Sequence, residues 1–205
     1  MSRLPTLIDE LLTGRREQVV IGAPLSPRPV ILAGSFNPLH RAHLAMADYA
    51  ASQLGRDVHF ELSVSNVDKA TLTTAEVIWR IEQFPPERHV VVTRAPRFID
   101  KARVMPDATF VVGYDTLERI VDTNRYLNEQ ERDSALASLA ERVAGFLVFG
   151  RVSGERFCGV EDIALPDSLA RCCRPVSEQE FRADISSSEI RTSAFRNAHG
   201  EQRRQ

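Results

Sequence analysis

The stretch that decides the fold is Val30-Ile-Leu-Ala-Gly-Ser-Phe-Asn-Pro-Leu-His40-Arg-Ala-His43-Leu44. It begins with a short apolar run, continues through a glycine and a proline-containing turn, and leads into an alanine-rich segment. This order predicts a buried strand, a tight turn and the start of a helix. The first turn of a helix offers free backbone N–H groups and the positive end of the helix dipole, so it can hold phosphate. His40 and His43 are three residues apart, and they would share one face there and could donate hydrogen bonds to a polyphosphate.

Segments of these two kinds alternate along the rest of the chain. The predicted strands are Val30–Ala33, His59–Val64, His89–Thr93, Thr109–Val112, Gly145–Phe149 and a short one near Asp162–Leu165. The predicted helices are Leu4–Leu12, Ala42–Leu54, Thr74–Phe84, Thr116–Asp122, Glu129–Arg142 and Ser186–Asn197. Trp79 lies at helical spacing and is interpreted as a packing residue. The alternation predicts an α/β, Rossmann-like, doubly wound parallel sheet with helices on both faces, which binds ligands at the carboxyl ends of its strands.

Length and composition fit one ordinary globular domain. The chain has 205 residues, 43% of them hydrophobic and 26% charged, with a formal net charge of -2. This excludes a disordered polar chain, a collagen-like repeat and a disulfide-dense miniprotein. We expect an N-terminal arm over residues 1–29, one domain over 30–197 and a polar tail over 198–205.

Charge and cysteine content narrow the class further. The net charge argues against a protein that coats nucleic acid or an acidic membrane through bulk charge. The three cysteines form neither a disulfide framework nor a zinc-site pattern, which fits reduced thiols. No signal peptide or membrane span is evident. We therefore expect a cytoplasmic protein without a nucleic-acid or membrane partner, and the sequence leaves a homo-oligomer open.

A second motif lies near the end of the chain. It reads Asp184-Ile-Ser186-Ser187-Ser188-Glu189-Ile190-Arg191. Ser186 followed three residues later by Glu189 is a capping box that opens a helix. The hydroxyls of Ser187 and Ser188, the free N–H groups and Arg191 would together form a second phosphate cradle. The plain alternative is a capped helix without a ligand.

Together the two motifs resemble the nucleotidylyltransferase superfamily. The first is similar to its G-x-F-x-P-x-H-x-G-H signature, with Ala42 where the family usually has glycine. The second is similar to its I-S-S-T-x-I-R motif, with Ser188 in place of threonine. Within the superfamily the chain is most like the nicotinamide and nicotinate mononucleotide adenylyltransferases. That likeness rests on a lysine after the second predicted strand, a G-x-D after the fourth, an arginine after the fifth and a segment that encloses the pyridine ring: Lys69, Gly113-Tyr-Asp115, Arg151 and Arg94–Asp100.

The resemblance implies a reaction and a set of roles. A mononucleotide phosphate attacks the α-phosphorus of ATP, giving a dinucleotide such as NAD, or its acid form, and pyrophosphate. His40, His43 and Arg191 would be the catalytic residues. The implied ATP site also includes Gly34, Ser35, Phe36, Gly113, Asp115, Arg151, Ser187 and Ser188. The implied mononucleotide site is Ser35, Phe36, Lys69 and Phe98. Mg²⁺ would be carried mainly by the ATP phosphates, so no protein metal ligands are expected.

Plainer interpretations of single residues stay open. Lys69 could be merely solvated, Arg151 could form a surface ion pair, and Phe98 could belong to the core. Asp115 could cap the helix that follows it. The acceptor could instead be phosphopantetheine, a sugar phosphate or an alcohol phosphate, with CTP used by some relatives. A catalytically weak nucleotide-binding regulator is the alternative from another class, and the choice between amide and acid pyridine is also open.

Overall fold

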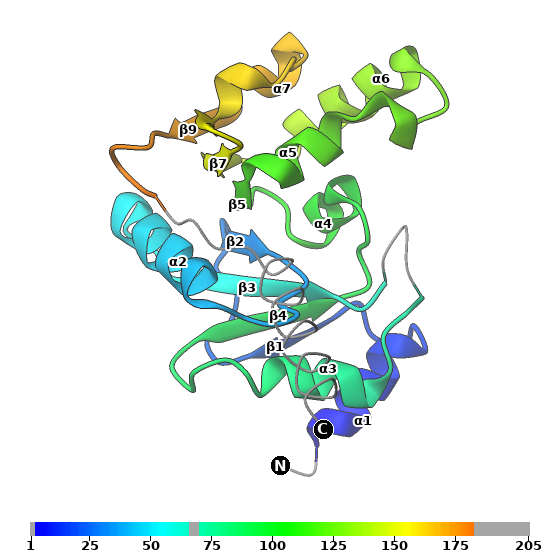
Figure 1. Ribbon diagram of the computed structural model, residues 1–205. Coiled ribbons are helices and arrows are strands. Elements are labelled where there is room, and N and C mark those ends of the chain that lie inside the picture. The colour runs from blue at the N-terminus through cyan, green and yellow to red at the C-terminus, as the bar shows by residue number, and fades with distance from the viewer. Residues whose placement is uncertain (1–2, 66–69, 183–205) are drawn as a thin grey trace, which may run out of the picture.

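The computed structural model describes residues 3–65 and 70–182. Within them lies a seven-stranded sheet in the order β1-β4-β3-β2-β5-β6-β9 (Figure 1). Its strands are β1 (Gln18–Ile21), β2 (Val30–Ala33), β3 (Val58–Ser63), β4 (His89–Thr93), β5 (Thr109–Gly113), β6 (Gly145–Phe149) and β9 (Cys173–Val176). All neighbours pair in parallel except β1, which is antiparallel to β4. The predicted Rossmann-like α/β fold is confirmed.

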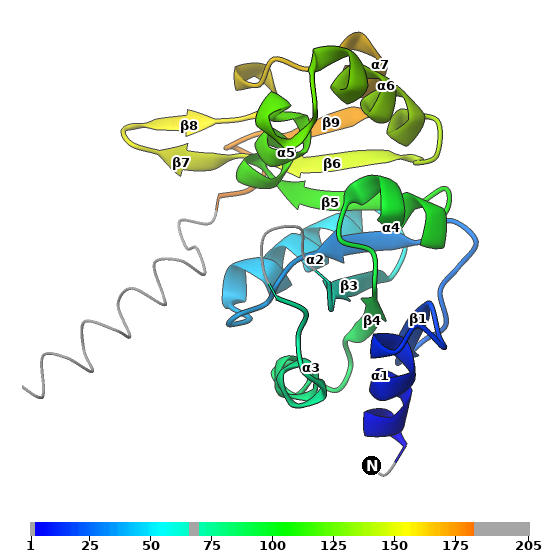
Figure 2. The ribbon, with the colours of Figure 1, turned by 90° about the vertical axis from the view of Figure 1, so that its right-hand side faces the viewer.

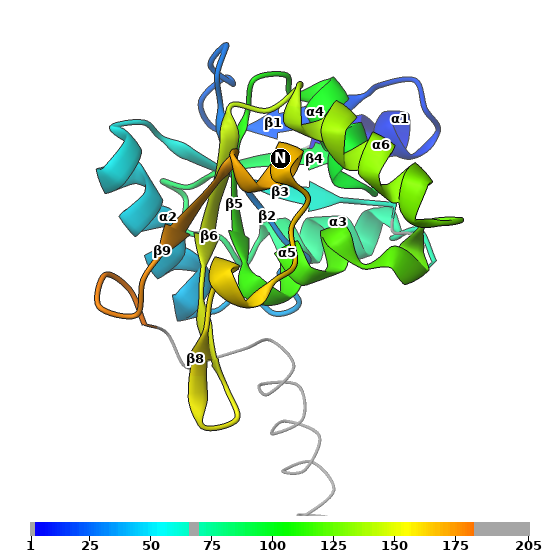
Figure 3. The ribbon, with the colours of Figure 1, turned by 90° about the horizontal axis from the view of Figure 1, so that it is seen from above.

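Helices cover both faces of this sheet. They are α1 (Leu4–Leu12), α2 (Arg41–Leu54), α3 (Thr74–Ile81), α4 (Phe98–Val104), α5 (Tyr114–Val121), α6 (Glu129–Ala140) and the short α7 (Asp167–Ala170). Seen from above, α2 lies on one side of β5 and β6, and α4, α5 and α6 lie on the other (Figure 3). No helix in the described part of the chain is long and apolar enough to cross a membrane.

The apolar strand sequences follow from burial on both faces. Val30 and Leu32 of β2 face the core that α1, α2 and α3 share, and Ile31 between them faces the core of α4 to α7. Successive side chains of a strand point to opposite faces. A strand covered on both sides must therefore be apolar at every position, which gives the continuous runs seen in the sequence.

The N-terminal segment packs against the domain. Ile8 and Leu11 of α1 are fully buried in the core beneath α2 and α3, and Val19 of β1 is 3% exposed. Strand β1 pairs with β4, with Gln18 opposite Thr93. The segment predicted as an arm thus supplies an edge strand and a helix to the same folded body.

Several local predictions need correction. Residues near Asp162–Leu165 form no strand, because Val160–Asp162 is a 3-10 turn and the next strand of the sheet is β9. Trp79 is 51% exposed, because Val77 and Ile81 occupy the buried face of α3. A two-stranded ribbon of β7 (Arg151–Ser153) and β8 (Arg156–Cys158) continues beyond β6 and was not predicted (Figure 2). The predicted helix Ser186–Asn197 lies outside the described residues.

Candidate active site

A cavity of about 1190 Å³ lies at the carboxyl ends of the central strands. From β2 the chain adds β3 and β4 on one side, and from β5 it adds β6 on the other, so the direction of winding reverses between β2 and β5. Open α/β sheets bind ligands at such a switch point. Of the described residues predicted for the site, all but Phe36 line this cavity, namely Gly34, Ser35, His40, His43, Phe98, Gly113, Asp115 and Arg151.

The turn after β2 is anchored in the core by the side chain of Phe36. Phe36 has a φ of 44° and is fully buried, and its ring packs edge-on against Phe60 and Phe84. A positive φ costs a residue with a side chain on the order of 1 kcal/mol, so packing must hold it in place. A Cβ at Gly34 would lie 2.7 Å from the Phe36 ring. Gly34 therefore makes room for this ring and also lines the cavity.

The two histidines form one compact unit at the start of α2. His40 is the N-cap residue and His43 is the third residue of the helix. Their rings stack, with centroids 3.6 Å apart and planes inclined by 20°. The backbone N–H of His40 donates to Nδ1 of His43 over 3.4 Å. Because Nδ1 of the neutral ring accepts here, its hydrogen sits on Nε2.

Burial keeps this histidine unit uncharged. Desolvation, and secondarily the neighbouring His40, lower the pKa of His43 from 6.5 to about 3. Burial also lowers the pKa of His40. Both rings are therefore neutral at pH 7, and His43 presents an N–H donor in a wall of the cavity. A neutral donor beside a helix N-terminus fits an anionic ligand, whose arrival would raise the pKa of the ring.

Asp115 and Arg151 form an ion pair in the wall of the cavity. A carboxylate oxygen of Asp115 lies 2.5 Å from a guanidinium nitrogen of Arg151. Gly113 is the N-cap of α5, so the alternative interpretation of Asp115 as a cap is wrong. Asp115 instead sits in the first turn, where the helix dipole favours a negative charge. The two residues predicted for ATP thus already bind each other, while their side chains stay 47% and 37% exposed.

Gly150 makes the position of Arg151 possible. A Cβ on Gly150 would lie 2.3 Å from the Phe157 ring and 2.7 Å from the carbonyl oxygen of Cys158. Only glycine therefore lets β8 fold back on β7 at this point. The resulting ribbon of β7 and β8 extends away from the body of the protein (Figure 2). Arg151, the first residue of β7, lines the cavity.

Phe98 is both a core and a cavity residue. It begins α4, and its half-buried ring packs against Phe110 and Phe146, with centroids 5.3 and 6.0 Å apart. The same side chain lines the cavity. Phe98 therefore packs against the core and also lines the cavity, so the two interpretations of this residue do not exclude each other.

The structure does not describe all of the residues that the sequence predicts for the site. Lys69, Ser187, Ser188 and Arg191 lie outside the described residues. Ala42, which replaces the usual glycine, is 5% exposed and lines the cavity with part of its surface.

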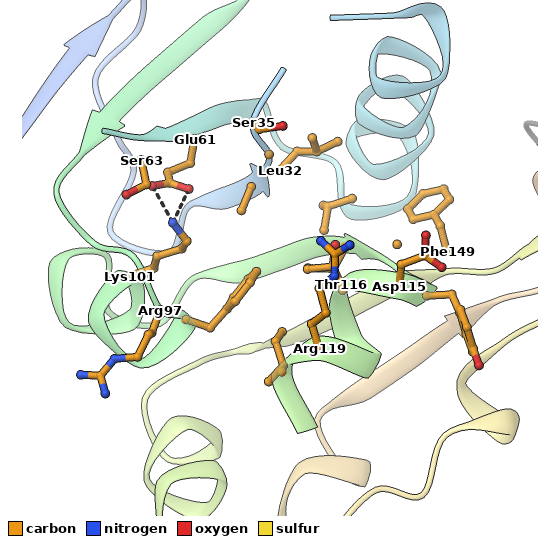
Figure 4. Close-up of a pocket in the computed structure, with 18 of the residues that line it drawn as sticks. Leu32, Ser35, Glu61, Ser63, Arg97, Lys101, Asp115, Thr116, Arg119 and Phe149 are labelled. Carbon is orange, nitrogen blue, oxygen red and sulfur yellow. Dashed lines mark hydrogen bonds and ion pairs between the residues drawn. The ribbon is translucent and has the colours of Figure 1, made fainter. Parts of the chain in front are cut away.

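A buried ion pair that the sequence analysis did not assign lies in the cavity wall (Figure 4). Nζ of Lys101 on α4 lies 2.9 and 2.8 Å from the two carboxylate oxygens of Glu61 on β3. Thr93 donates to the same carboxylate over 2.6 Å, and Lys101 donates to the carbonyl of Ala95 over 2.7 Å. A glutamate inside a buried strand is itself a signal, because such a residue needs a charged partner. The partner comes from a helix that the sequence did not reveal.

Comparison with known proteins identifies the family. The model of a family described as cytidylyltransferase-like matches residues 31–193, which is most of the chain and includes both sequence motifs. The chain belongs to the cytidylyltransferase-like family. A solved structure of a protein of unknown function from Archaeoglobus fulgidus is 24% identical, covering 50% of this chain and 80% of that one, with a TM-score of 0.30. No curated protein matches the chain.

Membership of the cytidylyltransferase-like family makes this chain a nucleotidyltransferase in the general sense. The cavity of this cytidylyltransferase-like protein contains no cluster of three metal-ligating side chains among residues 3–65 and 70–182. Two of the carboxylates that line it, Glu61 and Asp115, are each paired with a cation.

Proposed function

We propose that this protein is an adenylyltransferase that joins the AMP moiety of ATP to the phosphate of nicotinamide or nicotinate mononucleotide. The observation that carries the proposal is the convergence of the predicted residues from four strand ends on one cavity, with the neutral histidine pair at the start of α2. A cavity of about 1190 Å³ is at the large end for small-molecule sites and suits two substrates held together.

The chemistry asks little of the protein beyond alignment. A phosphate oxygen of the mononucleotide forms a bond to the α-phosphorus of ATP, and the bond from that phosphorus to the bridging oxygen of pyrophosphate breaks. The attacking phosphate is already an anion, so the step needs no general base. Holding both reactants in line and stabilising negative charge at the α-phosphoryl group are then the main contributions.

The described residues divide between these tasks. His43 would donate its Nε2 hydrogen to phosphate oxygens, and His40 would act beside it. Asp115 would accept hydrogen bonds from ribose hydroxyls of ATP, and Arg151 would turn toward the nucleotide. Ser35 would contact the mononucleotide through the turn backbone, and Phe98 would flank its ring. Lys69, Ser187, Ser188 and Arg191 keep the phosphate-binding roles that the sequence predicts for them.

Magnesium is proposed to enter with its substrate. It would arrive bound to the triphosphate and water, because no dedicated set of ligands is present among the described residues.

The experiment is pyrophosphate release from ATP and magnesium, with nicotinamide mononucleotide and nicotinate mononucleotide offered separately. Release with either acceptor supports the proposal. A parallel arm with CTP is warranted by the name of the matched family. Release with CTP and none with ATP would replace adenylyl by cytidylyl transfer. Nucleotide binding without release in any arm would instead favour a regulator.

A further inference from the structure

Arg119 lines the cavity from α5, and sequence reasoning did not connect this residue with binding. It lies one helical turn after Asp115 on α5, so both residues occupy the same face of the helix. Both line the cavity. Its side chain extends from α5 toward the end of β2, beside Thr116 (Figure 4).

The other described cations of the cavity wall already have partners. Arg97 pairs with Asp100, Lys101 with Glu61, and Arg151 with Asp115. Arg80 donates to the carbonyl oxygen of Ser35 over 2.9 Å. Arg125 pairs with Asp122, and Arg182 pairs with Glu178. Each of these charges is therefore at least partly compensated inside the protein.

Arg119 differs from all of them. Its guanidinium makes no hydrogen bond or ion pair with any residue in 3–65 or 70–182. The acidic residue one turn away, Asp115, is held by Arg151 instead. An arginine whose donors are unused and which faces a cavity provides both a positive potential and a planar fork for an oxyanion.

The fold indicates which substrate would meet this charge. The histidine pair approaches the cavity from α2, on one face of the sheet, whereas α5 lies on the other face with α4. Phe98 at the start of α4 packs against the same core as Leu117 and Ile120 of α5. Arg119 therefore enters from the side that carries Phe98, predicted to flank the acceptor ring, and Asp115, predicted to hold the ATP ribose. The histidines predicted for the ATP phosphates lie on the opposite side.

We infer that Arg119 binds an oxyanion of the acceptor substrate, an inference that rests on the proposed function. Two groups of that acceptor have the required chemistry: its phosphate, and the ring carboxylate of nicotinate mononucleotide. Either would accept two parallel N–H donors from the guanidinium.

The test compares Arg119→Gln and Arg119→Lys with the wild-type protein. For Arg119→Gln we expect KM for the acceptor to rise by at least about tenfold, because a charge-assisted hydrogen bond to the acceptor is lost. KM for ATP should change by less than about twofold. Arg119→Lys should lie between the two, because it keeps the charge and loses the fork. Arg142→Gln is the matched control, since Arg142 is exposed and lies outside the cavity wall.

The acceptor arms distinguish the two oxyanions. An equal loss with nicotinamide and nicotinate mononucleotide indicates the phosphate, and a loss with nicotinate mononucleotide alone indicates the carboxylate. Unchanged KM values, or a rise confined to ATP, would overturn the inference.

Calorimetric binding of each mononucleotide separates this inference from the proposed function. Wild-type binding that weakens in Arg119→Gln, without turnover in any arm, would retain the inference and reject adenylyl transfer. Turnover by the wild-type protein, together with unaltered mononucleotide binding in Arg119→Gln, would support adenylyl transfer and reject the inference about Arg119. If the wild-type protein binds neither mononucleotide, both fall.

Discussion

The rings of His40 and His43 stack within 3.6 Å of each other, while the backbone N–H of the first donates to Nδ1 of the second. The arrangement fixes the tautomer of His43. Burial lowers the pKa of both rings, and the neighbouring His40 lowers that of His43 further. At pH 7 both rings are therefore neutral, and each keeps one ring N–H as a hydrogen-bond donor.

Replacing His43 by alanine is expected to lower turnover by at least about tenfold, because removal of one preorganised donor commonly costs 10²–10³ in rate. The fold should remain, since His43 lies in the cavity wall and Phe36 keeps its contacts with Phe60 and Phe84. Steady-state pyrophosphate release and circular dichroism measure the two effects. Wild-type turnover in a folded His43→Ala protein would end the proposed role.

The same residue makes stability depend on pH. In the unfolded chain His43 takes up its proton near pH 6.5, whereas in the folded protein its pKa is about 3. Between these values the unfolded state binds more protons, so the free energy of unfolding falls as the pH decreases from about 6.5 toward 3. Urea unfolding at several pH values should show this slope, and His43→Gln should make it shallower. An identical slope in the variant would contradict the low pKa.

The pair formed by Asp115 and Arg151 is expected to affect affinity more than stability. Because both side chains are partly exposed, Asp115→Asn should change the free energy of unfolding by about 0–1 kcal/mol. Affinity for ATP should weaken about fivefold or more, as expected for the loss of a hydrogen bond donated to a charged acceptor. Asp48→Asn, which removes an exposed partner of Arg88 outside the cavity, is the control. Equal ATP affinity in both variants would exclude Asp115 from the nucleotide site.

The buried pair of Glu61 and Lys101 predicts a strongly non-additive mutant cycle. Glu61→Gln or Lys101→Met alone should destabilise the fold by about 3–5 kcal/mol, because each leaves a buried charge without its partner. The double variant should be more stable than either single variant. Chemical denaturation of the four proteins measures the coupling, and additive effects would show that the charges do not depend on each other.

Much of the sheet could be predicted because its central strands are covered on both faces. The runs Val30–Ala33 and Gly145–Phe149 are apolar throughout, so the sequence identifies them as buried strands. Strand β9 contains Arg174 and Pro175, which only an edge position tolerates, and no local signal distinguishes it from a loop. Helical spacing placed Trp79 on α3 correctly but could not indicate which face of that helix is buried.

For the candidate site too, the sequence could predict some residues and not others. Residues directly after strands could be identified, because parallel strands end at one edge and local motifs mark the turns. Lys101 and Arg119 could not, since their importance depends on which distant residues are near them. Lys101 meets a glutamate on another strand, and Arg119 is distinguished by having no partner among the described residues.

The pairing of β1 with β4 has a consequence for how the protein is produced. Strand β1 is synthesised well before β4. The two strands can therefore pair only after the ribosome has also made β4, near the middle of the chain. In a polypeptide that lacks the residues before Val30, β4 would become an exposed edge strand. Its three consecutive valines could then pair with strands of other molecules. A variant without residues 1–29 should therefore self-associate when it is expressed. The full chain should not, because β1 covers the edge of β4.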